Sequence, residues 1–211
     1  MDKRKIVFII GMHRCGTSLL ASCLKDNGFS IGKTINKDKN WQNPQGYFEN
    51  DKLTEFHDEL LRYNNSDWLN INTSKMLYTS NHVDRYRKLI YSEFGNEELI
   101  LIKDPRLTFF VNFLKDVCNG YYNYNFLFLT RNKEECCISL SKAQYKSYEE
   151  AHNLYDKTMT YFSESFLKVD HNNIINNNND TVITIAKFCN FSIIKNTENK
   201  VDYKLYRNKN V

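Results

Sequence analysis

Proline and glycine are scarce in this chain, whose 211 residues include only 2 Pro and 7 Gly. This composition excludes a collagen-like chain and a long flexible linker. Extended apolar runs are also missing: the run Ile6–Ile10 covers five residues, too few for a membrane span or for the apolar segment of a signal peptide. We therefore expect one domain over residues 1–211, in a cytoplasmic protein without a membrane span.

Cysteine spacings typical of zinc sites or disulfide frameworks are absent. The six cysteines form no C-x-x-C pair, and no His/Cys spacing resembles a zinc site. We expect reduced thiols and no metal. The cysteines are residues 15, 23, 118, 136, 137 and 189.

A strong excess of charge is also missing: the 29 basic residues only slightly outnumber the 25 acidic ones, which gives a net charge of +4. So small an excess favours an anionic ligand held in one pocket over a broad nucleic-acid surface. Apolar residues make up 41% of the chain and aromatic residues 14%, which is enough for a substantial core. The expected partner is a small molecule and not a nucleic acid, and the oligomeric state is left open.

Short apolar runs alternate with segments of helical periodicity. The runs Lys5–Ile10, Glu98–Lys103 and Asn125–Thr130 have the composition of buried parallel strands. This alternation predicts a three-layer α/β/α domain with a mainly parallel central sheet, similar to P-loop NTPases. Helices are predicted over Thr17–Asn27, 50–63, 82–94, Leu107–Val117, Lys133–Ala143, Ala151–Phe166 and Thr181–Asn190, a short strand over Leu167–Asp170, and a surface loop over Asn172–Asn179.

The segment between the first two strands is long and polar at its start. Residues 28–48 predict a long loop, and loops of this length are usually functional or mobile. We expect residues 28–97 to form an acceptor-side loop and helical insertion. Trp41, Tyr47 and Phe48 are candidates to line an acceptor pocket, although simple packing explains these aromatics equally well.

The first motif, residues 11–18, follows a predicted strand and opens a predicted helix. This is the context in which backbone N–H groups and the helix dipole bind a phosphate. Its spacing matches G-x-x-x-x-G-K-[ST] except that Thr17 replaces the lysine, while a cation stands inside the loop at Arg14. The donors offered to an anion are Arg14, Cys15, Gly16, Thr17 and Ser18.

Two further motifs follow the other buried strands. Arg131 comes directly after one strand, and Ser139 lies eight residues later on a predicted helix. Ligands bind at this edge of an open α/β sheet, and the guanidinium fork of arginine suits a phosphate. Lys103, Asp104 and Arg106 stand at the end of another strand, where three charges are expected to face a cleft because burying them unpaired is costly.

The first loop, V-F-I-I-G-M-H-R-C-G-T-S-L-L, resembles the 5′-phosphosulfate loop of sulfotransferases that use 3′-phosphoadenosine 5′-phosphosulfate (PAPS). The segments L-T-R-N-K-E-E-C-C-I-S-L, L-I-L-I-K-D-P-R-L and N-P-Q-G-Y-F-E-N are similar to other parts of that family, in the same order. Many members carry Ser where this chain has Cys15, and Pro where it has Lys133.

The resemblance implies a role for each matching residue. The loop 11–18 would bind the 5′-phosphosulfate of PAPS, with Cys15 contributing mainly its N–H group, and Arg131 with Ser139 would bind the 3′-phosphate. Lys103 would contact the transferring sulfuryl group, and Asp104 and Arg106 would orient that group or the acceptor. Glu49 is the first candidate for the general base and His57 the second. No metal is implied, and the acceptor would be a small molecule or a carbohydrate.

Two other functions fit parts of the pattern. One is a P-loop nucleoside or nucleotide kinase, in which Asp104 would hold Mg²⁺; the missing loop lysine argues against it. The other is a nucleotide-binding module without turnover. The presence of Lys103 and Glu49 is only a weak argument against a module without turnover.

Overall fold

The central sheet of the protein, in this computed structural model, has four strands. The structure describes residues 3–35, 46–72, 75–144, 147–176 and 178–194. The strands are β1 Lys5–Gly11, β2 Leu99–Lys103, β3 Asn123–Thr130 and β4 Leu167–Asp170, in the order β2-β1-β3-β4. Every pairing is parallel. The predicted buried strands are confirmed, because apolar runs such as Ile6–Ile10 are fully covered on both faces of the sheet.

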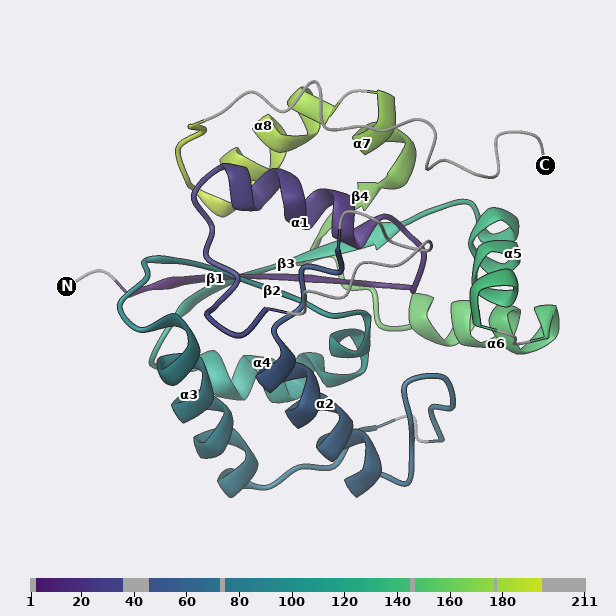
Figure 1. The fold of residues 1–211 in the computed structure, drawn as a ribbon, viewed down its shortest axis with the longest axis horizontal. Coiled ribbons are helices and arrows are strands. Elements are labelled where there is room, and N and C mark those ends of the chain that lie inside the picture. Colours follow the sequence, from purple (N-terminus) through teal and green to yellow (C-terminus); the bar gives the residue numbers. More distant parts are fainter. Residues whose placement is uncertain (1–2, 36–45, 73–74, 145–146, 177, 195–211) are drawn as a thin grey trace.

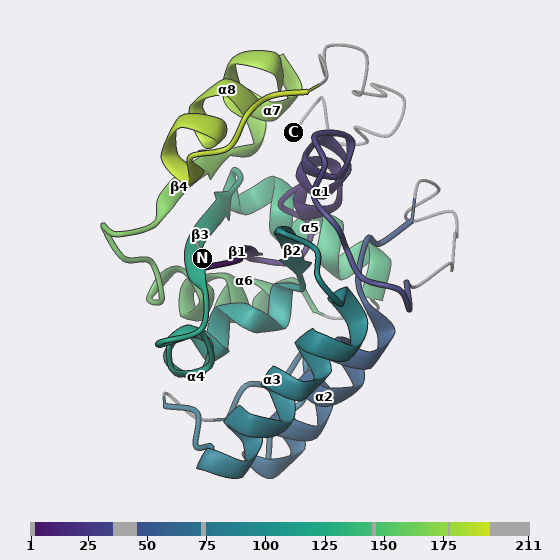
Figure 2. The same cartoon turned by 90° about the vertical axis from the view of Figure 1, so that its left-hand side faces the viewer.

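Helices cover both faces of this sheet (Figures 1 and 2), which confirms the predicted three-layer α/β/α fold with a parallel sheet. One outer layer contains α1 Thr17–Asp26, α7 His171–Asn176 and α8 Asn178–Cys189. The opposite layer contains α2 Asp51–Tyr63, α3 Ser80–Phe94 and α4 Val111–Cys118. Helices α5 Lys133–Gln144 and α6 Tyr148–Met159 lie toward the end at which the strands finish (Figure 1).

The register of the strands brings three chain segments to one edge of the sheet. Ile9 of β1 lies opposite Lys103, and Gly11 lies opposite Leu129. The residues that follow β1, β2 and β3 therefore leave the sheet side by side. This carboxyl edge is where open α/β sheets bind ligands, and it is where the three sequence motifs are placed.

The predicted helix over Leu107–Val117 is wrong in its first half. Residues Pro105–Phe110 form a 3₁₀ helix, η1, and the α-helix α4 begins only at Val111. Asp104 accepts a hydrogen bond from the Arg106 N–H at 2.9 Å, which holds the chain in a tight turn after Pro105. Short 3₁₀ turns of this kind are common at the start of α-helices.

Two further expectations are corrected between residues 148 and 189. Helix α6 ends at Met159, whereas the prediction extended to Phe166; the following segment packs Phe162 and Phe166 against the rings of β3 instead. The predicted loop Asn172–Asn179 contains α7 and the first turn of α8. Ile174 is buried there, so its packing stabilises a short helix that the Asn-rich sequence disfavours.

Within the described ranges, no helix combines the length and apolar character that a bilayer crossing requires. The interpretation of residues 28–97 as an acceptor-side insertion stays a prediction. Trp41, its first aromatic candidate, lies outside the described residues.

Candidate anion and transfer site

The loop after β1 depends on two glycines with left-handed backbone. Gly11 has φ +131°, and a Cβ atom there would lie 2.5 Å from the Leu129 carbonyl oxygen. Gly16 has φ +90°, and a Cβ atom would lie 2.6 Å from the His171 ring. Neither position accepts a side chain without a shift of its neighbours. The loop is held at its base by the Gly11 N–H, which donates to the Thr108 hydroxyl at 2.8 Å.

The loop ends at Gly16, directly before the start of α1. Gly16 is the N-cap of this helix and has no side chain with which to satisfy the first N–H groups, and the first turn carries no acidic residue. Arg14 adopts φ 68°, a conformation that is uncommon outside glycine and that clusters at ligand sites. The N-terminus of α1 therefore has the geometry and polarity of an anion site.

Arg14, Arg131 and Ser139 meet at this loop. The Arg14 Nε donates to the Ser139 hydroxyl at 3.1 Å, and the Arg131 guanidinium donates to the Arg14 carbonyl at 2.9 Å. The other edge of Arg131 pairs with Glu135 at 2.9–3.0 Å. The structure thus brings together the two motifs that the sequence placed after separate strands, 117 residues apart. Their assignment to donor binding stays a prediction.

Lys103 and Glu49 form a second cluster on the other side of the loop. The Lys103 ammonium lies 2.5 Å from the Glu49 carboxylate and donates to the Tyr47 carbonyl at 3.1 Å. Ser18, in the first turn of α1, donates to the same carbonyl at 3.3 Å. The backbone of Tyr47 therefore joins β2 to α1. The ring of Phe48 lies 6.0 Å from the Lys25 ammonium.

Glu49 is nearly enclosed between two cations. Its second oxygen lies 3.6 Å from the Arg106 guanidinium, in addition to the Lys103 contact. Burial raises the pKa of Glu49, and the positive charge of Lys103 opposes this rise. Burial thus favours the protonated form of Glu49, while the neighbouring lysine favours its ionised form.

Asp104 and Arg106 form an inner ion pair behind these residues. The Arg106 Nε donates to both Asp104 oxygens at 2.8–2.9 Å, and its NH1 group donates to Asp58 at 2.7 Å. Burial alone would raise the pKa of Asp104, but Arg106 and the hydrogen bond from His57 hold it well below its usual range. Asp104 thus serves as the negatively charged partner of Arg106 and His57. These contacts do not show the predicted role of Asp104 in substrate binding, which stays a prediction.

The structure does not support His57 as the general base. Its Nδ1 lies 2.8 Å from Asp104 and its Nε2 lies 2.8 Å from the Tyr86 hydroxyl, with the side chain only 1% exposed. With both ring nitrogens bonded to buried protein groups, His57 has no free atom to offer an acceptor. Sequence spacing could not reveal this, because the two partners lie on separate segments: Tyr86 on α3 and Asp104 at the start of η1.

His13, in the loop after β1, was not among the residues to which the sequence analysis gave a role. Its Nε2 is buried and has no hydrogen-bond partner among the described residues, while its ring lies 5.1 Å from Trp68. The pKa of His13 is lowered to about 3, mainly by burial; the charge of Asp104 opposes this, and the charges of Arg106, Lys103 and Arg14 add to it. Buried polar atoms without a hydrogen-bond partner are rare in native proteins, and water, an ion or a ligand can supply the partner.

Acidification is expected to destabilise the protein through its buried histidines. Burial lowers the pKa of His13 to about 3 and that of His171 to about 4, so between pH 6.5 and these values the unfolded chain binds protons that the folded chain does not. Their contribution to stability is therefore complete above pH 6.5 and is lost as the pH falls. Thermal unfolding across this window should show a shallower decline for His13→Gln, whereas His152→Gln, at an exposed site, should follow the wild type. Equal slopes in all three proteins would contradict the burial of a neutral His13.

Cys15 faces the interior and not the anion site. Its sulfur lies 3.5 Å from the sulfur of Cys136, which in turn donates to the His13 carbonyl at 2.9 Å. Cys15 is fully buried, and all six cysteines are unbridged thiols. The side chain of Cys15 is therefore not exposed to a ligand; its N–H group donates to the Met12 carbonyl at 3.3 Å, and its predicted contribution to an anion stays a prediction. Among the residues that the structure describes, no group of three or more potential ligands is arranged to hold a metal ion; the absence of a metal from the reaction stays a prediction.

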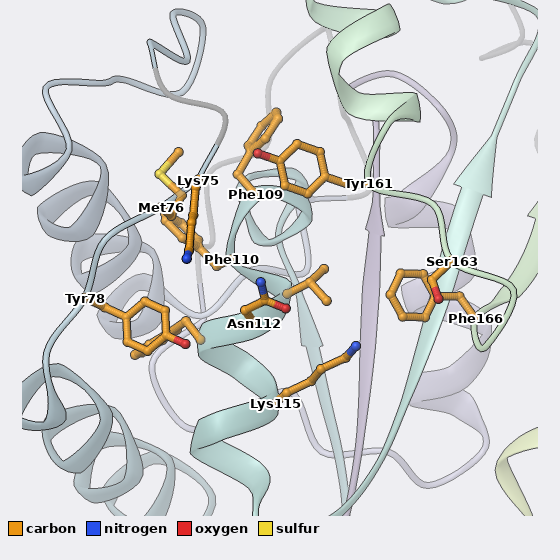
Figure 3. A pocket seen from close by; sticks show the side chains of 12 residues that line it. Lys75, Met76, Tyr78, Phe109, Phe110, Asn112, Lys115, Tyr161, Ser163 and Phe166 are labelled. Atoms are coloured by element: carbon orange, nitrogen blue, oxygen red, sulfur yellow. The ribbon is translucent and has the colours of Figure 1, made fainter.

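A separate cavity of about 210 Å³ lies beside η1 and α4 (Figure 3). Half of the residues that line it are aromatic, among them Tyr78, Phe109, Tyr161 and Phe166, and Lys115 also lines it. Neither the arginines of the first cluster, Arg14 and Arg131, nor the Lys103–Glu49 pair lines this cavity.

Comparison with known proteins gives the fold a clear match. No protein-family model matches the chain, and no curated protein matches its sequence. The sulfotransferase domain from the olefin synthase of Synechococcus PCC 7002 is similar in structure, with a TM-score of 0.58 and 13% identity over 99% of this chain and 84% of that one. The sulfotransferase domain from the curacin biosynthetic pathway gives a TM-score of 0.57 and 13% identity, over 92% of this chain and 76% of that one. The chain therefore has the α/β fold of these sulfotransferase domains, and residues 11–18 lie at the carboxyl edge of its parallel sheet.

Proposed function

We propose that this protein is a sulfotransferase that moves a sulfuryl group from PAPS to the hydroxyl or amine of an acceptor. In this reaction the acceptor atom bonds to sulfur, the bond between sulfur and the bridging oxygen breaks, and that oxygen leaves with adenosine 3′,5′-bisphosphate (PAP). The observation that carries the proposal is the meeting of Arg14, Arg131 and Ser139 at the start of α1, beside the Lys103–Glu49 pair. The fold shared with two sulfotransferase domains supports it.

Donor binding is assigned to the first cluster. The N–H groups at the start of α1, with Thr17, Ser18 and the backbone of Cys15 and Gly16, would hold the 5′-phosphosulfate. Arg131 and Ser139 would hold the 3′-phosphate. The chemistry fits, because Gly16 leaves the first N–H groups of α1 without a capping side chain, and the Arg131 guanidinium donates to the Arg14 carbonyl in the same loop.

Transfer chemistry is assigned to the second cluster. Lys103 and Arg14 would stabilise negative charge on the sulfuryl oxygens and on the leaving phosphate. Glu49 would accept the proton of the acceptor, since burial raises its pKa toward the range of a useful base. Arg106, 3.6 Å from Glu49, would orient this carboxylate. The buried Nε2 of His13 has no hydrogen-bond partner among the described residues, which makes it a further candidate for contact with a ligand.

Kinase chemistry has weaker support. Its Mg²⁺ ligand would be Asp104, but both oxygens of this carboxylate accept hydrogen bonds from Arg106, and His57 occupies one of them as well. Thr17 also replaces the lysine that grips the β- and γ-phosphates of a nucleoside triphosphate. A binding module without turnover would retain the first cluster and would not need the Lys103–Glu49 pair.

The acceptor is proposed to be a small molecule or a carbohydrate and the compartment the cytoplasm. Tyr47 and Phe48 remain candidates for contact with the acceptor. A panel of phenols, sugars and amines with labelled PAPS under single-turnover conditions would identify the acceptor class. Transfer to none of them, despite tight PAPS binding, would favour the module.

Selective stabilisation by PAP is the expected result of a thermal-shift screen. PAP at 100 times its dissociation constant should raise stability by about 2.7 kcal/mol, whereas ATP, ADP and GTP should raise it much less because they lack the 3′-phosphate. Stabilisation by ATP or GTP equal to that by PAP would overturn the donor assignment.

Arg14→Ala and Arg131→Ala are each expected to weaken PAP binding by about 1.5–3 kcal/mol, the range for hydrogen bonds to charged groups. Isothermal titration with PAP measures this loss. Arg85→Ala is the matched control, because Arg85 pairs with Glu59 on the surface and should leave PAP affinity unchanged. Unchanged affinity in both site variants would defeat the assignment.

A further inference from the structure

A buried chain of hydrogen bonds leads from α3 to the transfer cluster. The Tyr86 hydroxyl lies 2.8 Å from His57 Nε2, and His57 Nδ1 lies 2.8 Å from Asp104. Asp104 then accepts from Arg106 at 2.8–2.9 Å. Tyr86 is fully buried, and the side chains of His57 and Asp104 are each 1% exposed. None of these three side chains can reach a ligand directly.

The protonation states along this chain follow from its partners. Asp104 is ionised, because Arg106 and His57 hold its pKa well below the usual range. An ionised carboxylate only accepts hydrogen bonds, so His57 carries its proton on Nδ1. The Tyr86 hydroxyl lies at the other ring nitrogen, Nε2, and burial raises the pKa of Tyr86 well above its ordinary value, so this hydroxyl keeps its proton.

The chain ends on a guanidinium with three carboxylate neighbours. Beyond Asp104, Arg106 donates to Asp58 at 2.7 Å and lies 3.6 Å from Glu49. Glu49 in turn contacts Lys103 at 2.5 Å. The position of Arg106 thus decides how the Glu49 carboxylate is shared between two cations. A rotation of Arg106 would change both the electrostatic environment and the orientation of the Glu49 carboxylate, the proposed base.

Apolar side chains could fill the space of Tyr86 and His57 without burying any polar group. The rings of Phe56 and Phe113 lie 5.1 and 5.2 Å from the Tyr86 ring, so the hydroxyl and the imidazole are placed inside an aromatic cluster. Burying an ion pair and its partners is costly unless every member is hydrogen-bonded, and apolar residues of the same size are often at least as stable. A purely structural explanation therefore accounts poorly for the polar groups of this cluster.

We infer that Tyr86 and His57 are positioning residues, which fix Asp104 and Arg106 so that Glu49 and Lys103 meet the acceptor and the sulfuryl group in the productive geometry. This inference rests on the proposed sulfuryl transfer. It adds two residues to the reaction that touch neither substrate, and it gives His57 an indirect role in place of the direct one that the sequence suggested.

Tyr86→Phe tests the first link with the least change in volume. The variant should lose about 10-fold or more in kcat, since small misplacements of reacting groups are costly, while its dissociation constant for PAP stays within about 2-fold of wild type, because Arg14, Arg131 and Ser139 lie outside the chain. Activity is measured with labelled PAPS and the acceptor that the wild type uses best in the panel. The pH dependence of kcat should also shift, because it reports the proposed base.

Phe113→Leu is the matched control. It lies in the same aromatic cluster and touches the Tyr86 ring, but it carries no hydrogen bond of the chain. It should lower the unfolding temperature without moving the pH profile. A wild-type kcat and pH profile in Tyr86→Phe, or the same loss of kcat and shift of profile in Phe113→Leu, would overturn the inference.

His57 is tested by two further variants. His57→Asn keeps a donor near the Nδ1 position and should retain more kcat than His57→Ala, and added imidazole should restore part of the activity of His57→Ala. Equal kcat in the two variants and no rescue would count against the inference. Failure of the wild type to transfer sulfuryl groups would instead reject the proposed function, so the two failures are distinguishable.

Discussion

Replacement of Asp104 by alanine should lower the free energy of unfolding by about 3–5 kcal/mol, the cost of removing one partner from a buried ion pair. Asp104 is fully enclosed and accepts from the backbone and side chain of Arg106 and from His57. Without it, the His57 Nδ1–H and the Arg106 Nε–H are left buried without an acceptor. Asp58 and Glu49 remain beside Arg106, but neither lies within reach of the Nε hydrogen-bond position that Asp104 occupies.

Urea unfolding of the variant, with the slope compared to that of wild type, measures this loss. Asp84→Ala serves as the control, because Asp84 pairs with Arg87 at 3.4 Å with its side chain 64% exposed. A change below about 1 kcal/mol is expected for such a surface pair. If Asp104→Ala and Asp84→Ala have the same small effect, Asp104 is not the anchor of the buried network described above.

The strands and the anion loop could be predicted from local sequence. A run such as Ile6–Ile10 has no polar position and must be covered on both faces, which is the property of a central parallel strand. The segments that carry Arg14, Lys103 and Arg131 then reach the same edge of the sheet by topology alone, since the carboxyl ends of parallel strands share one edge. Their positions followed from where the apolar runs end.

Side-chain partners could not be predicted in the same way. His57 and Asp104 are 47 residues apart, and His57 and Tyr86 are 29 residues apart on different helices. No sequence period relates them, so a buried histidine with two bonded nitrogens has the same sequence appearance as an exposed, catalytic one. The Arg131–Glu135 pair is different, because its four-residue spacing at the start of α5 is a helical signal that sequence analysis could have found.

The 3₁₀ turn η1 and the helix α7 were missed for a related reason. Both are held by contacts beyond their own sequence: Thr108 of η1 binds the Gly11 backbone, and Ile174 of α7 is buried in the core. Local propensity favours an α-helix in the first case and a loop in the second. Tertiary packing decides both.

Lys103→Met is expected to reduce turnover by about 10²–10³-fold, the usual cost of removing one group that stabilises transition-state charge. Lys103 is the cation nearest Glu49, and it is held by the Tyr47 carbonyl at the mouth of the anion loop. PAP affinity should change much less, because the donor's phosphates are assigned to Arg14, Arg131 and Ser139. Single-turnover transfer and PAP titration separate the two quantities, and Lys52→Met, at an exposed site on α2, provides the control.

The double variant Lys103→Met/Glu49→Gln separates catalysis from stability. Lys103→Met alone leaves Glu49 buried beside Arg106 at 3.6 Å as its nearest remaining cation, so the folded state should be destabilised. The added Glu49→Gln change removes that uncompensated charge and should recover much of the lost stability while turnover stays low. Glu49→Gln alone should lower turnover more than PAPS affinity, because the proposed base is lost and the donor site is intact. If the double variant regained turnover together with stability, Lys103 and Glu49 would be a structural ion pair, and the proton acceptor and the sulfuryl contact would have to be sought elsewhere at the same edge of the sheet.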